Sequence, residues 1–173
     1  MKNVLKLLSR ILPVSLLVFC LFCPVLSYAD DVEKADLVVI HKSRRSMELW
    51  SNGATIARYR IALGFEPVGP KQFEGDGKTP EGVYTIVQHN EKSNFFRSLK
   101  LNYPNATDEM NAAATGKKPG GLIMIHGLPN NKTAEMVGHP NQDWTEGCIA
   151  VTDEEIMDIW RRTDKGTAVL IMP

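Results

Sequence analysis

The sequence predicts one mainly-β domain, a sandwich or barrel with small helical insertions. Three observations favour it. Short apolar or alternating segments recur along the chain, an Asn-Gly pair at 52–53 separates two of them, and only one segment, near the C-terminus, has a strong helical pattern. The length of 173 residues fits one domain, and 43% hydrophobic with 23% charged residues is an ordinary globular composition.

The first strands are predicted from local patterns. Residues 37–40 form an apolar run, and residues 47–50 and 57–63 alternate apolar with polar side chains. Asn52 and Gly53 favour the positive φ angles of a type I′ turn. The two alternating segments are therefore expected to form a hairpin.

The middle of the chain combines a loop, two strands and a helix. Residues 64–82 are rich in Gly and Pro and are expected to form a long loop. Strands are predicted over 83–88 and 98–103. Thr107 is positioned to cap a short helix over 108–114.

The C-terminal part contains the clearest helix. The apolar run 122–125 follows two glycines and suits a buried strand, and residues 149–151 suit a short one. Thr152 begins a capping-box pattern, so an amphipathic helix is predicted over 153–162. A closing strand over 167–172 completes the mainly-β prediction.

Residues 1–29 have the features of a secretory signal peptide. A basic start precedes an apolar run, and small residues at Ser27 and Ala29 fit cleavage after Ala29. The alternatives are an uncleaved membrane anchor and a lipoprotein signal. Two prolines interrupt the apolar run, and bulky phenylalanines precede Cys20 and Cys23, where a lipidation signal needs a small residue. Export with cleavage is the preferred interpretation.

The charge balance argues against nucleic acid as a partner. The chain has 20 basic and 20 acidic residues, and removal of the signal, which holds three basic residues and no acidic one, leaves a small acidic excess. A nucleic-acid-binding domain usually carries a basic excess. Membrane contact is expected only through the uncleaved signal.

Cys148 is the first candidate for chemistry. It is the one cysteine beyond the predicted signal, so it has no intramolecular disulfide partner. Gly147 before it lets the backbone turn tightly and approach a substrate. Cys148 is either a reactive nucleophile or a small buried hydrophobic residue.

His126 favours the nucleophile. It ends an apolar run, is followed by Gly127 and lies 22 residues before Cys148. An imidazole within hydrogen-bond reach would deprotonate the thiol, and His139 is a second imidazole able to approach. Zinc bound by these residues and Asp143 is the competing chemistry, but the spacing fits no standard zinc pattern. Neither a metal nor another cofactor is expected.

The segment Gly75-Asp76-Gly77-Lys78-Thr79 looks like the end of a phosphate-binding loop. However, Gln72 occupies the position of the first glycine of that motif, and Pro80 follows. The segment is interpreted as part of a turn-rich loop.

Four further segments follow one another in the order GDGKTPEG at 75–82, YPN at 103–105, IMIHG at 123–127 and WTEGCIAV at 144–151. Together they resemble the L,D-transpeptidase catalytic domain, the YkuD family, and most of all its small YafK-like branch. The resemblance covers residues 36–172. It implies a β-sandwich of the L,D-transpeptidase type with short helical insertions.

The resemblance also implies an enzyme of the bacterial periplasm or cell envelope that acts on peptidoglycan stem peptides. In such enzymes a cysteine attacks the carbonyl between the third stem residue, usually meso-diaminopimelate, and the terminal D-alanine. An amine of a second stem resolves the thioester, or water does so and the enzyme trims a stem or detaches a lipoprotein. Cys148 matches the nucleophile and His126 the general base. Gly147, Ile149, Thr145 and Gly127 match the oxyanion site and its lining, and Glu146 and His139 are candidates for supporting roles.

Two departures from the family signature leave transfer and hydrolysis both open. The common signature has a histidine at the position of Glu146 and an arginine at the position of Ala150. The missing arginine removes a contact to a substrate carboxylate, and an acid that points at the sulfur would disfavour the thiolate. Other cations able to restore the charge are Arg97, Lys100, Lys117 and Lys118.

Two rival functions use the same residues differently. In a sortase-like transpeptidase the catalytic histidine also precedes the catalytic cysteine in the sequence. However, the sortase arginine follows on a strand, whereas Arg161 and Arg162 fall in the predicted helix. A non-catalytic wall-binding module would leave Cys148 inert.

Overall fold

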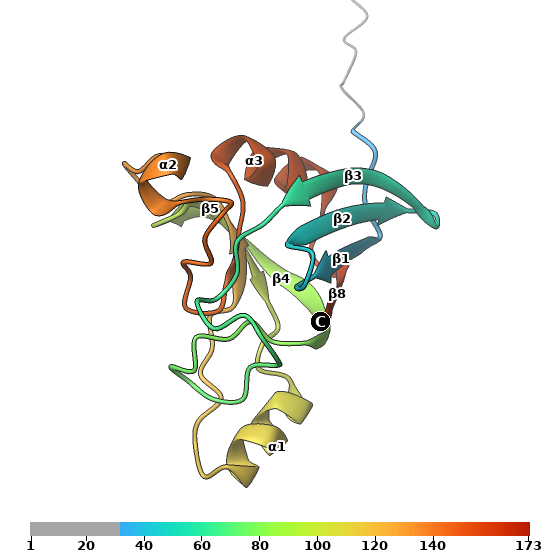
Figure 1. Ribbon diagram of the computed structural model, residues 1–173. Helices are drawn as coiled ribbons and strands as arrows, with labels where there is room; N and C mark the ends of the chain where they lie inside the picture. Colours follow the sequence, from blue (N-terminus) through green and yellow to red (C-terminus); the bar gives the residue numbers. More distant parts are fainter. Residues whose placement is uncertain (1–31) are drawn as a thin grey trace, which may run out of the picture. The chain divides into compact units, whose positions relative to one another are not determined.

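Eight strands and three helices make up residues 32–173, the part of the chain that the structure, a computed structural model, describes (Figure 1). The predicted signal peptide lies outside these residues and stays a prediction. No helix of the described part has the length and apolar character needed to cross a membrane. The elements are β1 Leu37–His41, β2 Ser46–Ser51, β3 Ala54–Arg60, β4 Gly82–Ser93, β5 Phe96–Leu101, α1 Ala106–Ala114, β6 Met124–His126, α2 Ala134–Val137, β7 Ile149–Ala150, α3 Asp153–Arg162 and β8 Ala168–Met172.

The strands form one mixed sheet in the order β3-β2-β1-β8-β4-β5-β6-β7. β4 joins the two halves, because its first residues pair with β8 and the rest pair with β5. The edges of the sheet meet where Ala62, just after β3, pairs with Ala150 of β7 through N–H···O bonds of 3.0 and 2.8 Å. The sheet therefore curls around its apolar side chains, and the mainly-β fold predicted from the sequence is confirmed.

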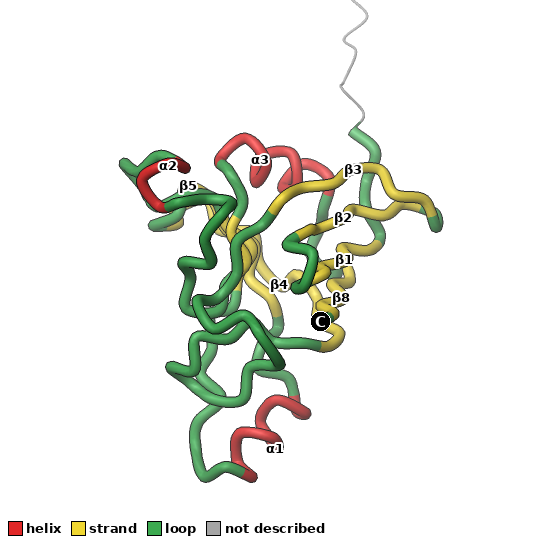
Figure 2. The backbone as a smooth tube through the Cα atoms, in the orientation of Figure 1, coloured by secondary structure: helices red, strands yellow, loops and turns green. Residues whose placement is uncertain are grey.

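One apolar cluster fills the interior of the curled sheet. It takes side chains from both halves, among them Ile40 of β1, Leu99 of β5 and Ile149 of β7, all fully buried. Ile156 and Ile159 bring one face of α3 against it. In Figure 2 the loops gather at one side of the strands, and α1 extends beyond them. The strands and their core thus form one side of the described domain, and the long loops form the other.

Local signals in the sequence correctly place the hairpin and the last helix. Asn52 and Gly53 have φ angles of 51° and 81°, as a type I′ turn requires. The Thr152 hydroxyl oxygen accepts the Glu155 N–H at 3.2 Å, and the Glu155 carboxylate accepts the Thr152 N–H at 2.8 Å. This is the predicted capping box of α3.

Several element boundaries differ from the prediction: β3 covers 54–60 rather than 57–63, β4 covers 82–93 rather than 83–88, and β5 covers 96–101 rather than 98–103. Two further differences have a clear local cause. The N-cap of α1 is Asn105 rather than Thr107, since its side-chain oxygen accepts the N–H groups of Thr107 and Asp108 at 2.9 and 3.2 Å. β6 begins at Met124 rather than at 122. Leu122 has a φ of 57°, which takes its backbone out of the extended conformation, and it is 64% exposed.

Replacement of Thr152 by alanine should lower the free energy of unfolding by about 1 kcal/mol, because α3 loses its side-chain cap. Urea denaturation followed by circular dichroism measures the change. Thr133→Ala is the matched control, since Thr133 is the N-cap of α2 but its side chain makes no capping hydrogen bond. Equal destabilisation by both substitutions would contradict the assigned role of the Thr152 hydroxyl.

Candidate active site

Cys148 lies immediately before β7 and faces a cavity of about 390 Å³. The thiol is partly exposed. Two loops form the walls, one before β4 and one before β6. The lining consists of glycines from both loops, the exposed apolar Phe65 and Leu122, the buried Ile123, and the charged residues Lys71, Glu74 and Glu146. The cavity therefore offers the sulfur a mixed surface, with charged side chains beside a larger apolar area.

The turn that carries Cys148 is held by Thr145 and requires Gly147. The Thr145 hydroxyl oxygen accepts the Gly147 N–H at 3.1 Å, and the hydroxyl donates to the Cys148 carbonyl at 2.8 Å. Gly147 has a φ of 131°, and a Cβ there would lie 2.6 Å from the Lys78 carbonyl oxygen. Any other residue would have to displace the Lys78 backbone. Thr145 and Gly147 therefore have clear structural reasons for their identity.

The Cys148 thiol is in its protonated form in this geometry. It donates to the Leu122 carbonyl at 3.4 Å, and that residue has the unusual positive φ described above. Burial raises the pKa of Cys148, while the Met124 backbone hydrogen bond and the charge of Lys71 lower it and the charge of Glu146 raises it further. The effect expected of Glu146 is thus present.

His126 ends β6 and is buried, with 2% exposure. Its Nδ1 lies 2.7 Å from the Gly127 carbonyl oxygen. Because a carbonyl can only accept, we assign the ring hydrogen to Nδ1 and the lone pair to Nε2. Burial, opposed by the hydrogen bond to Gly127 and helped by the charge of His139, lowers the pKa of His126 to about 4. The imidazole is therefore neutral near pH 7 and able to accept a proton.

The β6–β7 pairing places His126 and Cys148 near each other. The strands are parallel, with Ile125 beside Ile149 and His126 beside Ala150. Side chains two positions apart share a face, so Cys148, directly before β7, faces the same side as His126, about 7 Å away along the strand direction. No hydrogen bond joins the two side chains; each instead bonds a backbone carbonyl. A thiol that turned from Leu122 toward His126 would complete the pair.

Aromatic rings and unpartnered polar atoms surround His126. The Phe95 and Trp144 ring centroids lie 4.4 and 5.7 Å from its own. Ser98 is its cross-strand neighbour on β5. Three buried side-chain atoms lack a hydrogen-bond partner within residues 32–173: Ser98 Oγ, His139 Nδ1 and Trp144 Nε1. Such atoms are rare in folded proteins, and all three belong to neighbours of His126.

The remaining candidate residues have varied environments. A Cβ on Gly127 would lie 2.6 Å from the Asp153 carboxylate, so glycine permits the close approach of α3. Ile149 is fully buried in the core, and Ala150 is fully buried and does not line the cavity. Of the cations considered from the sequence, Arg97 stacks on Trp160 and Lys117 on Phe73.

The cation that reaches the cavity is Lys71, which no sequence pattern singled out. Phe95 and Ser98 were likewise missed, because their proximity to His126 depends on strand pairing and ring packing rather than on a motif. Within residues 32–173 no three His, Cys, Asp or Glu side chains converge to hold a metal ion.

The curled sheet, the turn that carries Cys148 directly before β7, and buried His126 at the end of the neighbouring strand β6 together define a class of protein, the L,D-transpeptidase catalytic domain. Residues 35–171 match the L,D-transpeptidase catalytic domain family, YkuD, and the chain belongs to that family. Over 130 residues the chain is 28% identical to YafK of Escherichia coli K12, a protein with a provisional L,D-transpeptidase name. The match covers 72% of this chain and 45% of YafK.

Solved structures show the same fold. The helical cell shape determining protein Pgp2 from Campylobacter jejuni matches with a TM-score of 0.61 and 26% identity, over 78% of this chain and 46% of Pgp2. Bd1075 of Bdellovibrio bacteriovorus matches with a TM-score of 0.56 and 20% identity, over 84% of this chain and 50% of Bd1075. The chain therefore spans about half the length of these relatives.

The burial of neutral His126 predicts a loss of stability in acid. The unfolded chain takes up a proton on this residue near pH 6.5, whereas the folded protein takes it up only near pH 4. Its contribution to stability is therefore complete above pH 6.5 and falls as the pH drops to 4, by about 2–3 kcal/mol at pH 4.5. Urea denaturation at pH 7.5 and 4.5 measures the free energy of unfolding lost in acid. In His126→Gln this loss should be smaller than in the wild type by about 2–3 kcal/mol.

His41→Gln is the control, because His41 is only partly buried at the end of β1. This variant should keep the acid sensitivity of the wild type. If His126→Gln lost as much stability in acid as the wild type, the neutral state assigned to His126 would be wrong.

Proposed function

We propose that the protein is an exported cysteine acyl-transferase that acts on peptidoglycan stem peptides in the bacterial periplasm or cell envelope. The family assignment supports the substrate class, since L,D-transpeptidases act on such stems. The observation that carries the proposal is Cys148 at a cavity mouth with neutral, buried His126 on the same face of the β6–β7 pair. No cofactor is required, since thiol, imidazole and backbone supply each role.

In the proposed acylation, Nε2 of His126 takes the thiol proton and the Cys148 sulfur attacks the carbonyl that links the third stem residue to D-alanine. The sulfur–carbon bond forms and a tetrahedral oxyanion develops. Because the Gly147 N–H is already donated to Thr145, we assign oxyanion stabilisation to the Cys148 N–H. His126 then protonates the departing D-alanine amine, and a thioester remains.

The thioester is resolved by an amine or by water. An amine of a second stem gives a 3→3 cross-link, and water gives a trimmed stem. Two features of the cavity favour water. Glu146 lines the wall where the family signature has a histidine, and the side chain of Ala150, in the place of the usual arginine, is buried away from the cavity. Hydrolysis of stem or lipoprotein–wall linkages is therefore the second candidate function.

The relatives suggest a wider role. Pgp2 is described as a determinant of helical cell shape, and its identity to this chain is 26%. A contribution to cell shape through trimming or cross-linking of stems is part of the proposal.

The rival function is a non-catalytic wall-binding module in which Cys148 is inert. Loss of turnover on substitution of Cys148 would exclude this rival.

Cys148→Ser and His126→Ala should each abolish turnover of tetrapeptide muropeptides, measured by mass spectrometry of the products. The double variant should be little worse than either single one, because nucleophile and base act as one unit. His41→Ala, a partly exposed histidine at the end of β1, is the matched control and should retain activity.

Near-normal turnover by His126→Ala would overturn the assigned base. His139→Ala then becomes the decisive variant, since His139 lies close enough to influence the pKa of His126. Turnover by Cys148→Ser at the wild-type rate would remove the thioester mechanism altogether.

The product mixture should contain at least as much trimmed monomer as 3→3 dimer. Each missing charge-assisted hydrogen bond to an acceptor stem costs about 1.5–3 kcal/mol, while water competes regardless of acceptor affinity. Glu146→His should raise the dimer share in the same mass-spectrometric assay. Glu66→His is the control, because Glu66 is exposed and does not line the cavity. A wild-type digest dominated by 3→3 dimers would refute the preference for water.

A further inference from the structure

The loop between β3 and β4 is fastened by two buried lysines. Lys42, with 2% of its side chain exposed, donates to the carbonyls of Gly69 and Thr79 at 2.6 and 2.8 Å. It also pairs with the Glu81 carboxylate at 2.8 Å. Lys42 therefore ties two distant points of the loop to β1 and is fully occupied in doing so.

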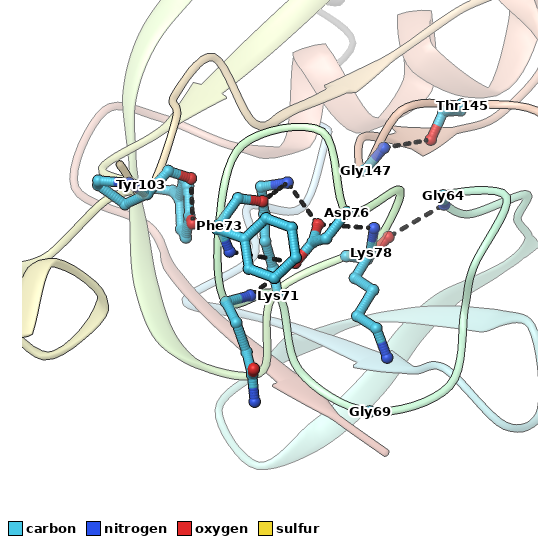
Figure 3. A network of polar contacts seen from close by, with 12 residues as sticks. Gly64, Gly69, Lys71, Phe73, Asp76, Lys78, Tyr103, Thr145 and Gly147 are labelled. Carbon is cyan, nitrogen blue, oxygen red and sulfur yellow. Dashed lines mark hydrogen bonds and ion pairs between the residues drawn. The ribbon is translucent and has the colours of Figure 1, made fainter. Parts of the chain in front are cut away.

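The second lysine, Lys71, forms an ion pair with Asp76 inside the same loop (Figure 3). The nitrogen and oxygen lie 2.8 Å apart, and the side chains are 4% and 3% exposed. Asp76 also accepts the backbone N–H groups of Gln72, Phe73 and Lys78, at 2.7, 3.2 and 3.0 Å. Removal of Asp76 would leave all of these donors without their acceptor, so the pair is the centre of the loop's hydrogen bonding.

This loop packs directly against the turn that carries Cys148. The Lys78 carbonyl occupies the space that a Cβ on Gly147 would need, and the Gly77 carbonyl lies even closer to the Cβ position of Gly64. The Gly64 N–H donates to the Thr79 hydroxyl at 3.1 Å, and the Phe65 N–H donates to the Thr145 carbonyl at 2.9 Å. A shift of the loop would thus be transmitted to the cysteine turn by backbone contact.

Lys71 also supplies a positive charge near the sulfur. It lines the Cys148 cavity, whose other charged lining residues are Glu74 and Glu146. Lys71 favours the ionised thiol and Glu146 disfavours it. The other loop lysine, Lys78, directs its Nζ to the Val68 carbonyl and does not line this cavity. Lys71 is therefore the cation of the loop that is placed to act on the nucleophile.

We propose that Lys71 and Asp76 are positioning residues for the nucleophile: their ion pair holds the loop against the Cys148 turn, and Lys71 stabilises the thiolate. Asp76 limits this stabilisation, because its negative charge offsets that of Lys71. Lys71 thereby supplies a positive charge in a site whose signature arginine is replaced by Ala150. The proposal rests on the proposed role of Cys148 as nucleophile.

The test is the rate of Cys148 alkylation by iodoacetamide as a function of pH, measured on the purified full-length protein by mass spectrometry of the peptide that holds Cys148, so that Cys20 and Cys23 do not contribute. The thiolate displaces iodide, so the rate follows the ionised fraction and needs no peptidoglycan substrate. Lys71→Met should move the profile to higher pH and slow alkylation at pH 7 by about threefold or more, which corresponds to half a pKa unit. Lys71→Arg keeps the charge and should restore the wild-type profile.

Asp76→Asn should shift the alkylation profile in the opposite direction, to lower pH. It removes the negative charge that offsets Lys71 and keeps one oxygen, which can still accept the Gln72 and Phe73 N–H groups, so alkylation at pH 7 should become faster. Lys78→Met removes a cation from the same loop and should leave the profile unchanged. If the pair had a purely structural role, alkylation would be slower in both Lys71→Met and Asp76→Asn. Either that result or an unshifted Lys71→Met profile would overturn the proposal.

Thermal unfolding by circular dichroism checks that each variant is folded. If Lys71→Met alone does not fold, the double variant Lys71→Met/Asp76→Asn removes both charges together and should still be slower than Asp76→Asn. Equal rates in those two variants would also overturn the proposal. Shifted alkylation profiles without any turnover of muropeptides would instead uphold the positioning pair and refute the proposed function.

Discussion

The parallel pairing of β6 with β7 is the constraint on which the site depends. Two short strands bring His126 and Cys148 onto one face through the register Ile125–Ile149, and a slip by one residue would turn one side chain to the other face. Parallel strands also need a long crossover. The residues between His126 and Cys148 provide it, and they bring Thr145 and Trp144 to the site.

β7, the last strand in the sheet order, is held in place by backbone pairing with the segment that follows β3. β7 has only two residues, and its outer edge pairs with Ala62 just after β3. This contact closes the sheet and at the same time brings the beginning of the loop that holds Lys71 and Asp76 beside the cysteine turn. The same pairing therefore closes the sheet and brings the walls of the cavity together. This is why the backbone packs so tightly at Gly64, Gly77 and Gly147.

The electrostatics of the site keep both reacting groups uncharged at rest. Burial makes the His126 imidazole neutral and holds the Cys148 thiol in its protonated form. A neutral pair avoids the cost of burying an isolated charge, and in the mechanism we propose the thiolate is required only when a substrate arrives. Lys71, held by Asp76, is the nearby cation that makes that ionisation less unfavourable.

Short-range signals in the sequence determined the hairpin at Asn52 and Gly53, the capped helix after Thr152, and the chemical types of Cys148 and His126 in their motifs. Each of these depends on residues within a few positions of one another, where turn and capping preferences act directly. Only the tertiary structure decided that β8 lies parallel to β1, that Leu122 leaves the strand, and that Lys71 faces the cysteine cavity. These features depend on which distant segments pair, and the burial of a lysine becomes favourable only when the fold supplies its carboxylate partner.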